Sequence, residues 1–199
     1  MMPAHLATPV LAGPPRNLLW TVDQFHYLGD LGLFEGRRAM LIDGVIVEEG
    51  PMNPPHRIAL ELSSEALRVA FGGGWRICVQ MPLVLGQAMD PEPDIAVVAG
   101  SPRGSTTHPT TAAIVVEVAD SSLRYDTTVK LATYAAGNIA DYWVLDVNGR
   151  ELLVYRDPGP DPMALQGHNY FTKRVLGPAD TIAPLAAPNR TVNVADLLP

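Results

Sequence analysis

Two unbroken apolar runs, residues 94–99 and 113–119, constrain this chain most, because each contains an acidic residue. Asp94 begins the first run and Glu117 lies inside the second. Runs of this length without polar alternation are typical of strands buried on both faces of a sheet. An ionised carboxylate in such a strand loses its hydration, which costs free energy unless the charge is paired or binds a metal ion. The two acids therefore predict a shared cation where neighbouring strands meet.

Lys130 supports this hypothesis, since the chain has only two lysines, Lys130 and Lys173. Asp, Glu and Lys together are the residue types that metal-dependent cleavage of a phosphodiester needs. The same residues also allow a simpler arrangement, in which Asp94 caps a strand end and Glu117 forms a buried ion pair with Lys130. Both interpretations stay open at this point.

The bulk composition limits the classes of protein to consider. A chain of 199 residues predicts one domain, which we place at residues 21–199 after a flexible tail of residues 1–20. We expect no signal peptide and no membrane span. The single cysteine, Cys78, is interpreted as a buried apolar residue, and a lone cysteine fits a reducing cytoplasm. The net charge of -7 argues against a tight, sequence-independent nucleic-acid binder, although bound divalent cations would change the local sign.

Hydrophobic periodicity predicts the order of the elements. We expect helices over 21–31, 56–71 and 126–136, a hairpin of residues 40–42 and 45–47, and strands over 75–85, 94–99, 113–119, 141–147, 151–156 and 170–176. Asp43-Gly44 predicts a type I′ turn. Residues 51–55 are expected to form a loop, residues 157–167 are expected to be exposed, and the chain beyond 176 is weakly defined. From residue 56 onward the order predicts an α/β sandwich with a mixed central sheet.

Two residues of the helix predicted over 126–136 accompany Lys130. Asp126 lies four residues before Lys130, so the two share a helix face. Asp126 either forms an ordinary pair or cap there, or holds Lys130 in a site. Tyr134 falls near the same face and is expected to be a core aromatic residue with a hydroxyl group to offer.

Several segments resemble the Uma-type family of restriction-endonuclease-like proteins. They are the block Glu117-Val118-Ala119-Asp120-Ser121-Ser122-Leu123-Arg124-Tyr125-Asp126, then Lys130-Leu131, Tyr134, Asp141-Tyr142-Trp143-Val144, and residues 41–48 and 92–95. The similarity runs from about residue 21 to the C-terminus. That family is similar to the PD-(D/E)XK nuclease superfamily, whose αβββαβ core order matches the order predicted above. The helix over 21–31 and the hairpin precede that core, and a β extension follows it toward the C-terminus.

The resemblance also implies roles for individual residues. Asp94 and Glu117 occupy the positions of the two acids, while Ala119 stands where the superfamily has its lysine, so Lys130 of the following helix would take that role. Asp94, Glu117 and the backbone carbonyl of Val118 would hold Mg²⁺ or Mn²⁺, and Lys130 would orient water or steady the phosphate.

Two further residues have a structural and a functional interpretation. The first core helix of the superfamily often adds an acid to the site, and Glu61 is the candidate here; the alternative is an acid on a solvated helix face. His56 is either an exposed residue at the start of that helix or a substrate contact.

These observations predict a Mg²⁺-dependent endonuclease that acts on DNA, with a homodimer expected because a restriction-like nuclease must cut two strands. The alternative is a non-catalytic interaction module that retains the fold, which the net charge of -7 and the lack of a basic cluster favour. A metal-dependent hydrolase of a smaller phosphodiester is a third possibility.

Overall fold

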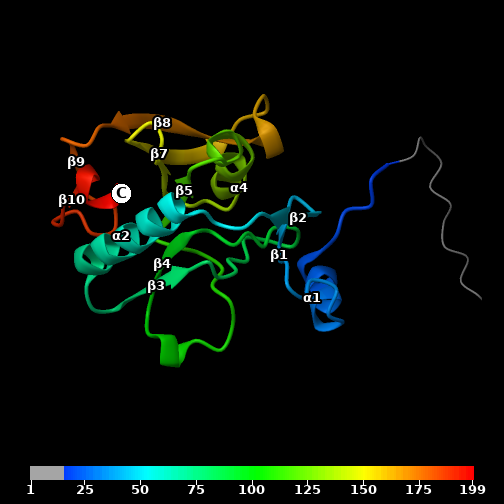
Figure 1. The fold of residues 1–199 in the computed structure, drawn as a ribbon. Coiled ribbons are helices and arrows are strands. Elements are labelled where there is room, and N and C mark those ends of the chain that lie inside the picture. The colour runs from blue at the N-terminus through cyan, green and yellow to red at the C-terminus, as the bar shows by residue number, and fades with distance from the viewer. Residues whose placement is uncertain (1–15) are drawn as a thin grey trace, which may run out of the picture.

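A six-stranded sheet lies at the centre of the computed structural model, which describes residues 16–199 (Figure 1). The strand order is β3-β4-β5-β6-β7-β8, and every neighbouring pair is antiparallel except β5 and β6, which are parallel. The predicted mixed sheet is therefore confirmed. Most of the predicted N-terminal tail, residues 1–15, lies outside the described residues.

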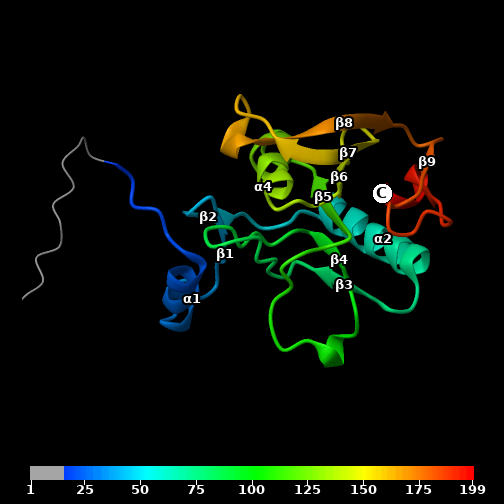
Figure 2. The ribbon, with the colours of Figure 1, turned by 180° about the vertical axis from the view of Figure 1, so that it is seen from behind.

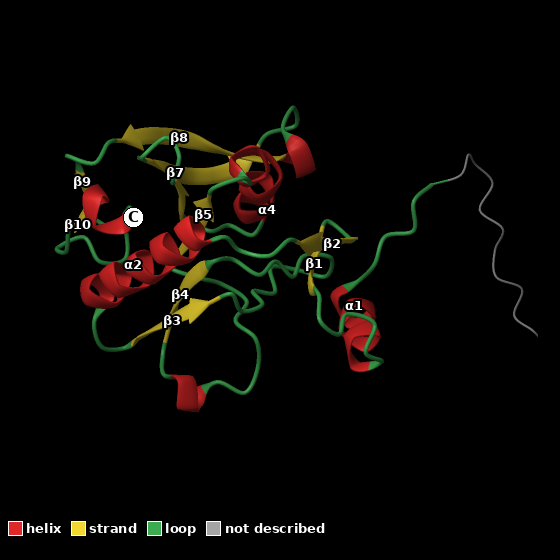
Figure 3. Ribbon diagram, viewed as in Figure 1, coloured by secondary structure: helices red, strands yellow, loops and turns green. Residues whose placement is uncertain are grey.

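The elements follow the predicted order. Figure 3 distinguishes the helices from the strands by colour. The sheet contains β3 (Trp75–Val79), β4 (Ile95–Ala99), β5 (Ile114–Ala119), β6 (Asp141–Asp146), β7 (Glu151–Pro160) and β8 (His168–Leu176). The helices are α1 (Val22–Asp30), α2 (Pro54–Phe71), α3 (Leu123–Tyr125) and α4 (Leu131–Ala136), with the π-helical turn η2 (Asp126–Lys130) joining α3 to α4. Smaller elements are the hairpin β1 (Arg38–Ile42) and β2 (Val45–Glu49), the pair β9 (Thr181–Ile182) and β10 (Val192–Asn193), and the 3₁₀ turns η1 (Pro102–Gly104), η3 (Leu165–Gly167) and η4 (Val194–Leu197). From α2 to β6 this is the αβββαβ core.

The sheet separates two hydrophobic cores. Figures 1 and 2 show the sheet with helices α2 and α4 from opposite sides. Helix α2 and the C-terminal segment pack on one face, and α4 packs on the other. Along β5, Val116 and Val118 belong to the core under α2, whereas Val115 and Ala119 belong to the core under α4. Because side chains alternate along a strand, Glu117 faces α4. Cys78 is buried in the core under α4, as predicted.

Helix α2 begins at Pro54, two residues before the predicted start. The Asn53 side chain accepts a hydrogen bond from the backbone N–H of His56, which caps the helix. Proline is tolerated in the first turn, since its missing N–H would have had no partner there. Residues 54 and 55, predicted as loop, therefore form the first turn.

Other boundaries also differ from prediction. Strand β3 ends at Val79 rather than at 85, because Gln80 adopts a positive φ of 48° that breaks the extended chain. Strand β7 continues to Pro160, because residues 158–160 pair with residues 168–170 of β8. The segment beyond 176, predicted to be weakly defined, forms β9, β10 and η4 and buries Val194 and Leu197 against α2. None of the helices in residues 16–199 has the length and apolarity to span a membrane.

The hairpin β1–β2 turns at Asp43-Gly44, as the sequence predicts. Both residues have positive φ, 49° and 75°, which is the conformation of a type I′ turn. Gly44 also lies close to Leu19, so a Cβ atom at position 44 would meet the Leu19 Cβ at 2.7 Å. The turn therefore requires glycine for conformation and for space.

We predict that Gly44→Ala lowers the free energy of unfolding by at least about 1–2 kcal/mol, the cost of a left-handed residue with a side chain. Gly73→Ala is the control, because a Cβ there meets no atom within 4 Å and the backbone φ is not positive. Urea unfolding of both variants measures the difference. Equal stability of the two variants would contradict the assigned turn.

Candidate functional site

Asp94 and Glu117 lie side by side on the face of the sheet that α4 covers. Ile95 pairs with Val116 in the antiparallel ladder, so Asp94 comes opposite Glu117 one step further along. The Asp94 N–H donates to Glu117 Oε2 (3.3 Å), and the Val118 N–H donates to Asp94 Oδ2 (2.9 Å). Both acids are buried. The structure thus brings together the two carboxylates that the sequence singled out.

Lys130 reaches the same place from the helical segment. Its Nζ lies 3.0 Å from Glu117 Oε2, 2.8 Å from Glu49 Oε1 and 3.7 Å from Asp126 Oδ1, and only 4% of its side chain is exposed. Burial acts to lower the pKa of Lys130, but the three surrounding acids outweigh it and raise that pKa above its ordinary value. The lysine is therefore a charged ammonium group within the protein.

The two central acids have pKa values displaced in opposite directions. Burial raises the pKa of Glu117 well above its usual range, against the opposing effect of Lys130. Burial also acts to raise the pKa of Asp94, but the hydrogen bond and charge of His56, with further help from Lys130, leave it below its ordinary value. Such a split between neighbouring carboxylates is common at functional sites.

Tyr134 and Asp126 surround the ion pair. The Tyr134 hydroxyl donates to Glu117 Oε1 at 2.5 Å, so both oxygens of Glu117 have partners. Asp126 accepts a hydrogen bond from the Ser122 hydroxyl, and the carbonyl of Asp126 accepts one from Tyr142 (2.8 Å). Turn η2 widens the helix at this point, and π-turns of this kind are frequent at functional sites. Asp126 therefore pairs with Lys130, and it does not cap the helix.

His56 supports Asp94 from the first turn of α2. Its Nε2 lies 3.2 Å from Asp94 Oδ1, and the Gln80 side chain donates to the same oxygen at 3.1 Å. Burial acts to lower the pKa of His56, but Asp94 raises it above the ordinary value. Of the two interpretations of His56, the exposed one is wrong, because the ring is half-buried in contact with the acid.

Glu61 is not part of the site. It is exposed and forms an ion pair with Arg57 at 2.9 Å. Successive residues of an α-helix are rotated by about 100°, so the five steps from His56 to Glu61 place the two on different faces. Its helix buries Leu60 and Ser63 instead. The solvated-face interpretation is the correct one.

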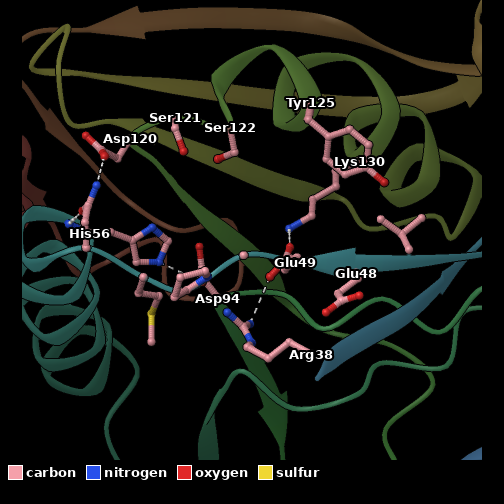
Figure 4. Close-up of a pocket in the computed structure, with 15 residues that line it drawn as sticks. Arg38, Glu48, Glu49, His56, Asp94, Asp120, Ser121, Ser122, Tyr125 and Lys130 are labelled. Atoms are coloured by element: carbon pink, nitrogen blue, oxygen red, sulfur yellow. Dashed lines mark hydrogen bonds and ion pairs between the residues drawn. The ribbon is translucent and has the colours of Figure 1, made fainter. Parts of the chain in front are cut away.

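A cavity of about 290 Å³ opens beside these residues (Figure 4). His56, Asp94 and Lys130 line it, together with Arg38, Glu49 and residues 120–122 and 125. Glu117 is not in the lining and lies behind Lys130 and Asp94, which contact it. Asp94 and Lys130 are therefore the groups that a molecule in the cavity would meet.

Sequence reasoning missed Glu49 and Arg38. Glu49 Oε1 contacts Lys130, and Glu49 Oε2 lies 3.1 Å from Arg38 Nη2. The hairpin was predicted, and its second strand ends in two acids, Glu48 and Glu49. The local pattern gave no sign of which acid points to the site, because that depends on packing against a segment 81 positions away.

The donor chemistry fits a hard cation. Within residues 16–199, no three His, Cys, Asp or Glu side chains gather as a ready metal-binding set. Mg²⁺, however, keeps several waters and is commonly held by one or two carboxylates. Asp94 supplies carboxylate oxygen atoms at the cavity wall, and Glu117 supplies further ones behind Asp94 and Lys130. The residues thus fit Mg²⁺ or Mn²⁺, with Lys130 now beside the Glu117 oxygen.

We predict that Lys130→Met lowers the free energy of unfolding by about 3–5 kcal/mol, because it leaves buried carboxylates without their counter-charge. Lys173→Met is the control, since Lys173 lies on the surface over the Tyr155 ring. It should change stability by no more than about 0.5 kcal/mol. Urea unfolding at neutral pH measures both, and a Lys130→Met protein as stable as the control would contradict the buried pair.

The raised pKa of Asp126 should make the stability of the protein depend on pH. Burial raises its pKa from 3.8 to about 6. The folded state therefore binds more protons than the unfolded state between these values, so this contribution is complete below about pH 4 and is lost as pH rises through 6. Asp126→Asn should remove a slope of at most about 1.4 kcal/mol per pH unit from the stability curve in that window. Parallel curves for the two proteins from pH 4 to 7 would contradict the shift.

Comparisons with known proteins find a family and a similar fold. A family model described as "Uma2: Putative restriction endonuclease" matches residues 22–195. A crystal structure from Anabaena variabilis ATCC 29413, of "a putative nuclease belonging to DUF820", matches with a TM-score of 0.62 and 14% identity, over 80% of this chain and 88% of that chain. No curated protein matches. Since the family model spans most of its length, this chain belongs to the Uma2 family.

Proposed function

We propose that this protein is a divalent-cation-dependent endonuclease that hydrolyses DNA phosphodiester bonds at the cavity beside Asp94. The observation that carries the proposal is the convergence of two carboxylates from adjacent strands with an ammonium group 3.0 Å from Glu117, at the wall of an open cavity. Membership of the Uma2 family and the likeness in fold indicate a restriction-endonuclease-like nuclease.

Asp94, Glu117 and the backbone carbonyl of Val118 are the groups that would hold Mg²⁺ or Mn²⁺. Such a cation, when bound, polarises the phosphate and lowers the pKa of water. Asp94 is already oriented by donors from Val118, Gln80 and His56. A carboxylate fixed in this way needs little reorganisation to bind a ligand.

Lys130 supplies positive charge to the substrate. Its ammonium lines the cavity and stays protonated, because the surrounding acids raise its pKa. A fixed cation at this position stabilises the negative charge that concentrates on phosphate during hydrolysis. Tyr134 holds Glu117 from the opposite side, and His56 holds Asp94, so each acid keeps its direction while Lys130 faces the cavity.

The proposed substrate is DNA, and cleavage of both strands is most simply achieved by a homodimer with two sites. We therefore propose a two-fold dimer as the acting species. Light scattering during size-exclusion chromatography, with and without an oligonucleotide duplex, tests this part separately from catalysis. A monomer in both conditions would exclude the dimer and leave the single-site chemistry in place.

The non-catalytic module is the second candidate, and specific observations favour it. Both oxygens of Asp94 and both oxygens of Glu117 already accept hydrogen bonds within the protein. The chain also carries a net charge of -7, which repels nucleic acid. Calorimetric titration with Mn²⁺ separates the two, since only the nuclease needs a cation. Binding of the cation together with cleavage of only a small phosphodiester would identify the protein as a metal-dependent hydrolase of such substrates.

We predict that Asp94→Asn and Glu117→Gln each abolish Mg²⁺-dependent nicking of a supercoiled plasmid, and that the double variant is no worse, because the two acids act as one unit. Lys130→Ala should lower the rate about 10²- to 10³-fold, the usual effect of losing one charge-stabilising donor, with Mn²⁺ binding retained. Glu61→Gln is the matched control and should cleave like the wild type, since Glu61 is exposed and outside the site.

Wild-type protein that binds neither Mg²⁺ nor Mn²⁺ and cleaves no form of DNA would overturn the nuclease proposal. If Asp94→Asn still nicks the plasmid, the active site does not include Asp94 and lies elsewhere in the protein. Far-ultraviolet circular dichroism of each variant, compared with the wild type, establishes that the fold is retained.

A further inference from the structure

The hairpin β1–β2 contributes a carboxylate that joins two cations. One oxygen of Glu49 lies 2.8 Å from the Lys130 ammonium, and the other lies 3.1 Å from the Arg38 guanidinium. Figure 4 shows this chain of contacts at the cavity, running from Lys130 through Glu49 to Arg38. The contact with Glu49 is the shortest ion pair that Lys130 makes. A residue from outside the αβββαβ core therefore binds the site lysine most closely.

The proposed function creates a need for this contact. Lys130 now lies beside Glu117 Oε2. A divalent cation on Glu117 would compete with the ammonium for the same carboxylate, because two positive charges in a poorly solvated place repel each other strongly. A buried ammonium that loses its counter-charge is costly, so Lys130 would leave for solvent unless another acid held it.

Glu49 is placed to do this. Its side chain is only 24% exposed, and Arg38 fixes its second oxygen, so the carboxylate is held between two cations. Asp126 is further from Lys130, at 3.7 Å. The neighbouring Glu48 lines the cavity as well, but its side chain is 56% exposed and pairs with Arg37. The hairpin thus offers two adjacent acids, of which one contacts the lysine.

We propose that Glu49 is a positioning residue: it retains the Lys130 ammonium at the cavity when Glu117 binds a divalent cation, and Arg38 holds Glu49 in place. This inference rests on the proposed function. It makes the N-terminal hairpin part of the active site, so that the αβββαβ core alone is incomplete for catalysis.

The chain offers a direct readout, because it contains only two lysines, Lys130 and Lys173. Protein labelled with ¹⁵N in lysine side chains gives at most two ammonium signals by NMR. A buried, hydrogen-bonded ammonium exchanges its protons slowly and is observed, whereas the surface Lys173 exchanges quickly. The signal that is missing from the spectrum of the Lys130→Met variant is thereby assigned to Lys130.

We expect the wild-type Lys130 signal to shift on addition of saturating Mg²⁺ and to remain visible. In Glu49→Gln the signal should be present without Mg²⁺, because Glu117 still holds the ammonium. It should vanish when Mg²⁺ is added, because the released ammonium exchanges its protons quickly with water. Glu48→Gln removes the same charge from the neighbouring residue of the strand and should leave the Lys130 signal as in the wild type, because Glu48 pairs with Arg37. An amide spectrum of each variant reports whether the fold is intact.

Kinetics give a second measurement on the same proteins. Glu49→Gln should lower kcat for DNA nicking about 10- to 100-fold, the usual effect of losing a group that orients an active-site residue, with KM little changed. In a Lys130→Met background, Glu49→Gln should have no further effect, because a positioning residue acts through its partner.

Two outcomes would overturn the inference while leaving the nuclease standing. One is a Lys130 signal in Glu49→Gln that stays visible with Mg²⁺ while nicking continues. The other is an equal loss of the signal in Glu48→Gln, which would show a general charge effect. If Mg²⁺ alters nothing in the wild-type spectrum and no DNA is cleaved, the proposed function and the inference fail together.

Discussion

The ion pair between Glu117 and Lys130 is the interaction around which this fold is arranged. Neither residue could be buried alone, since an unpaired charge in an apolar interior is strongly unfavourable. The pair is enclosed by further partners: Tyr134 on one oxygen of Glu117, the Asp94 backbone on the other, and Glu49 on the lysine. Replacing such a pair by apolar residues is often neutral or stabilising, so stability alone does not explain it. The proposed function gives these charges a chemical role as well.

The pair also explains why the site draws on segments from across the chain. Strand β5 supplies Glu117, the helical segment after it supplies Lys130, and the start of α2 supplies His56. The hairpin, which belongs to neither core of the central sheet, supplies Glu49. Each segment is held by its own packing, and the carboxylates and cations meet where those packed segments converge. Long-range topology therefore determines the geometry of the site, and local structure determines only which side chains each segment offers.

Local patterns were sufficient for much of the fold. Unbroken apolar runs identified β4 and β5, and Asp43-Gly44 identified the hairpin turn. The resemblance of the block from Glu117 to Lys130 indicated which charges belong together. Boundaries that depend on a partner strand were missed, as at Pro160, where pairing with β8 extends β7 through a segment rich in proline and glycine. The C-terminal segment was missed for the same reason, since it is ordered by contact with α2.

The same limit applied to the site. Asp94 and Glu117 share a face because the register that pairs Ile95 with Val116 places them opposite each other, and a slip of one residue would separate them. The sequence shows an acid in each of two buried strands, but it does not show this register. Glu49 and Gln80 could not be found, because no pattern near them records contact with Lys130 or Asp94. Glu61 was suggested only by the resemblance, and the rotation along α2 excludes it.

The π-turn η2 makes the site sensitive to chain length. A π-turn holds one residue more than a regular helical turn would, so residues before and after it are related by an altered rotation. Removal of a single residue from 127–129 would let the helix close regularly, and it would rotate the preceding turn by about 100° relative to Lys130. Lys130 and Tyr134 would stay on Glu117, while Ser122 and Tyr125 would leave the cavity wall. Among relatives of this protein, an alignment gap at that point would therefore mark a change in what the cavity accepts, even where every charged residue of the site is present.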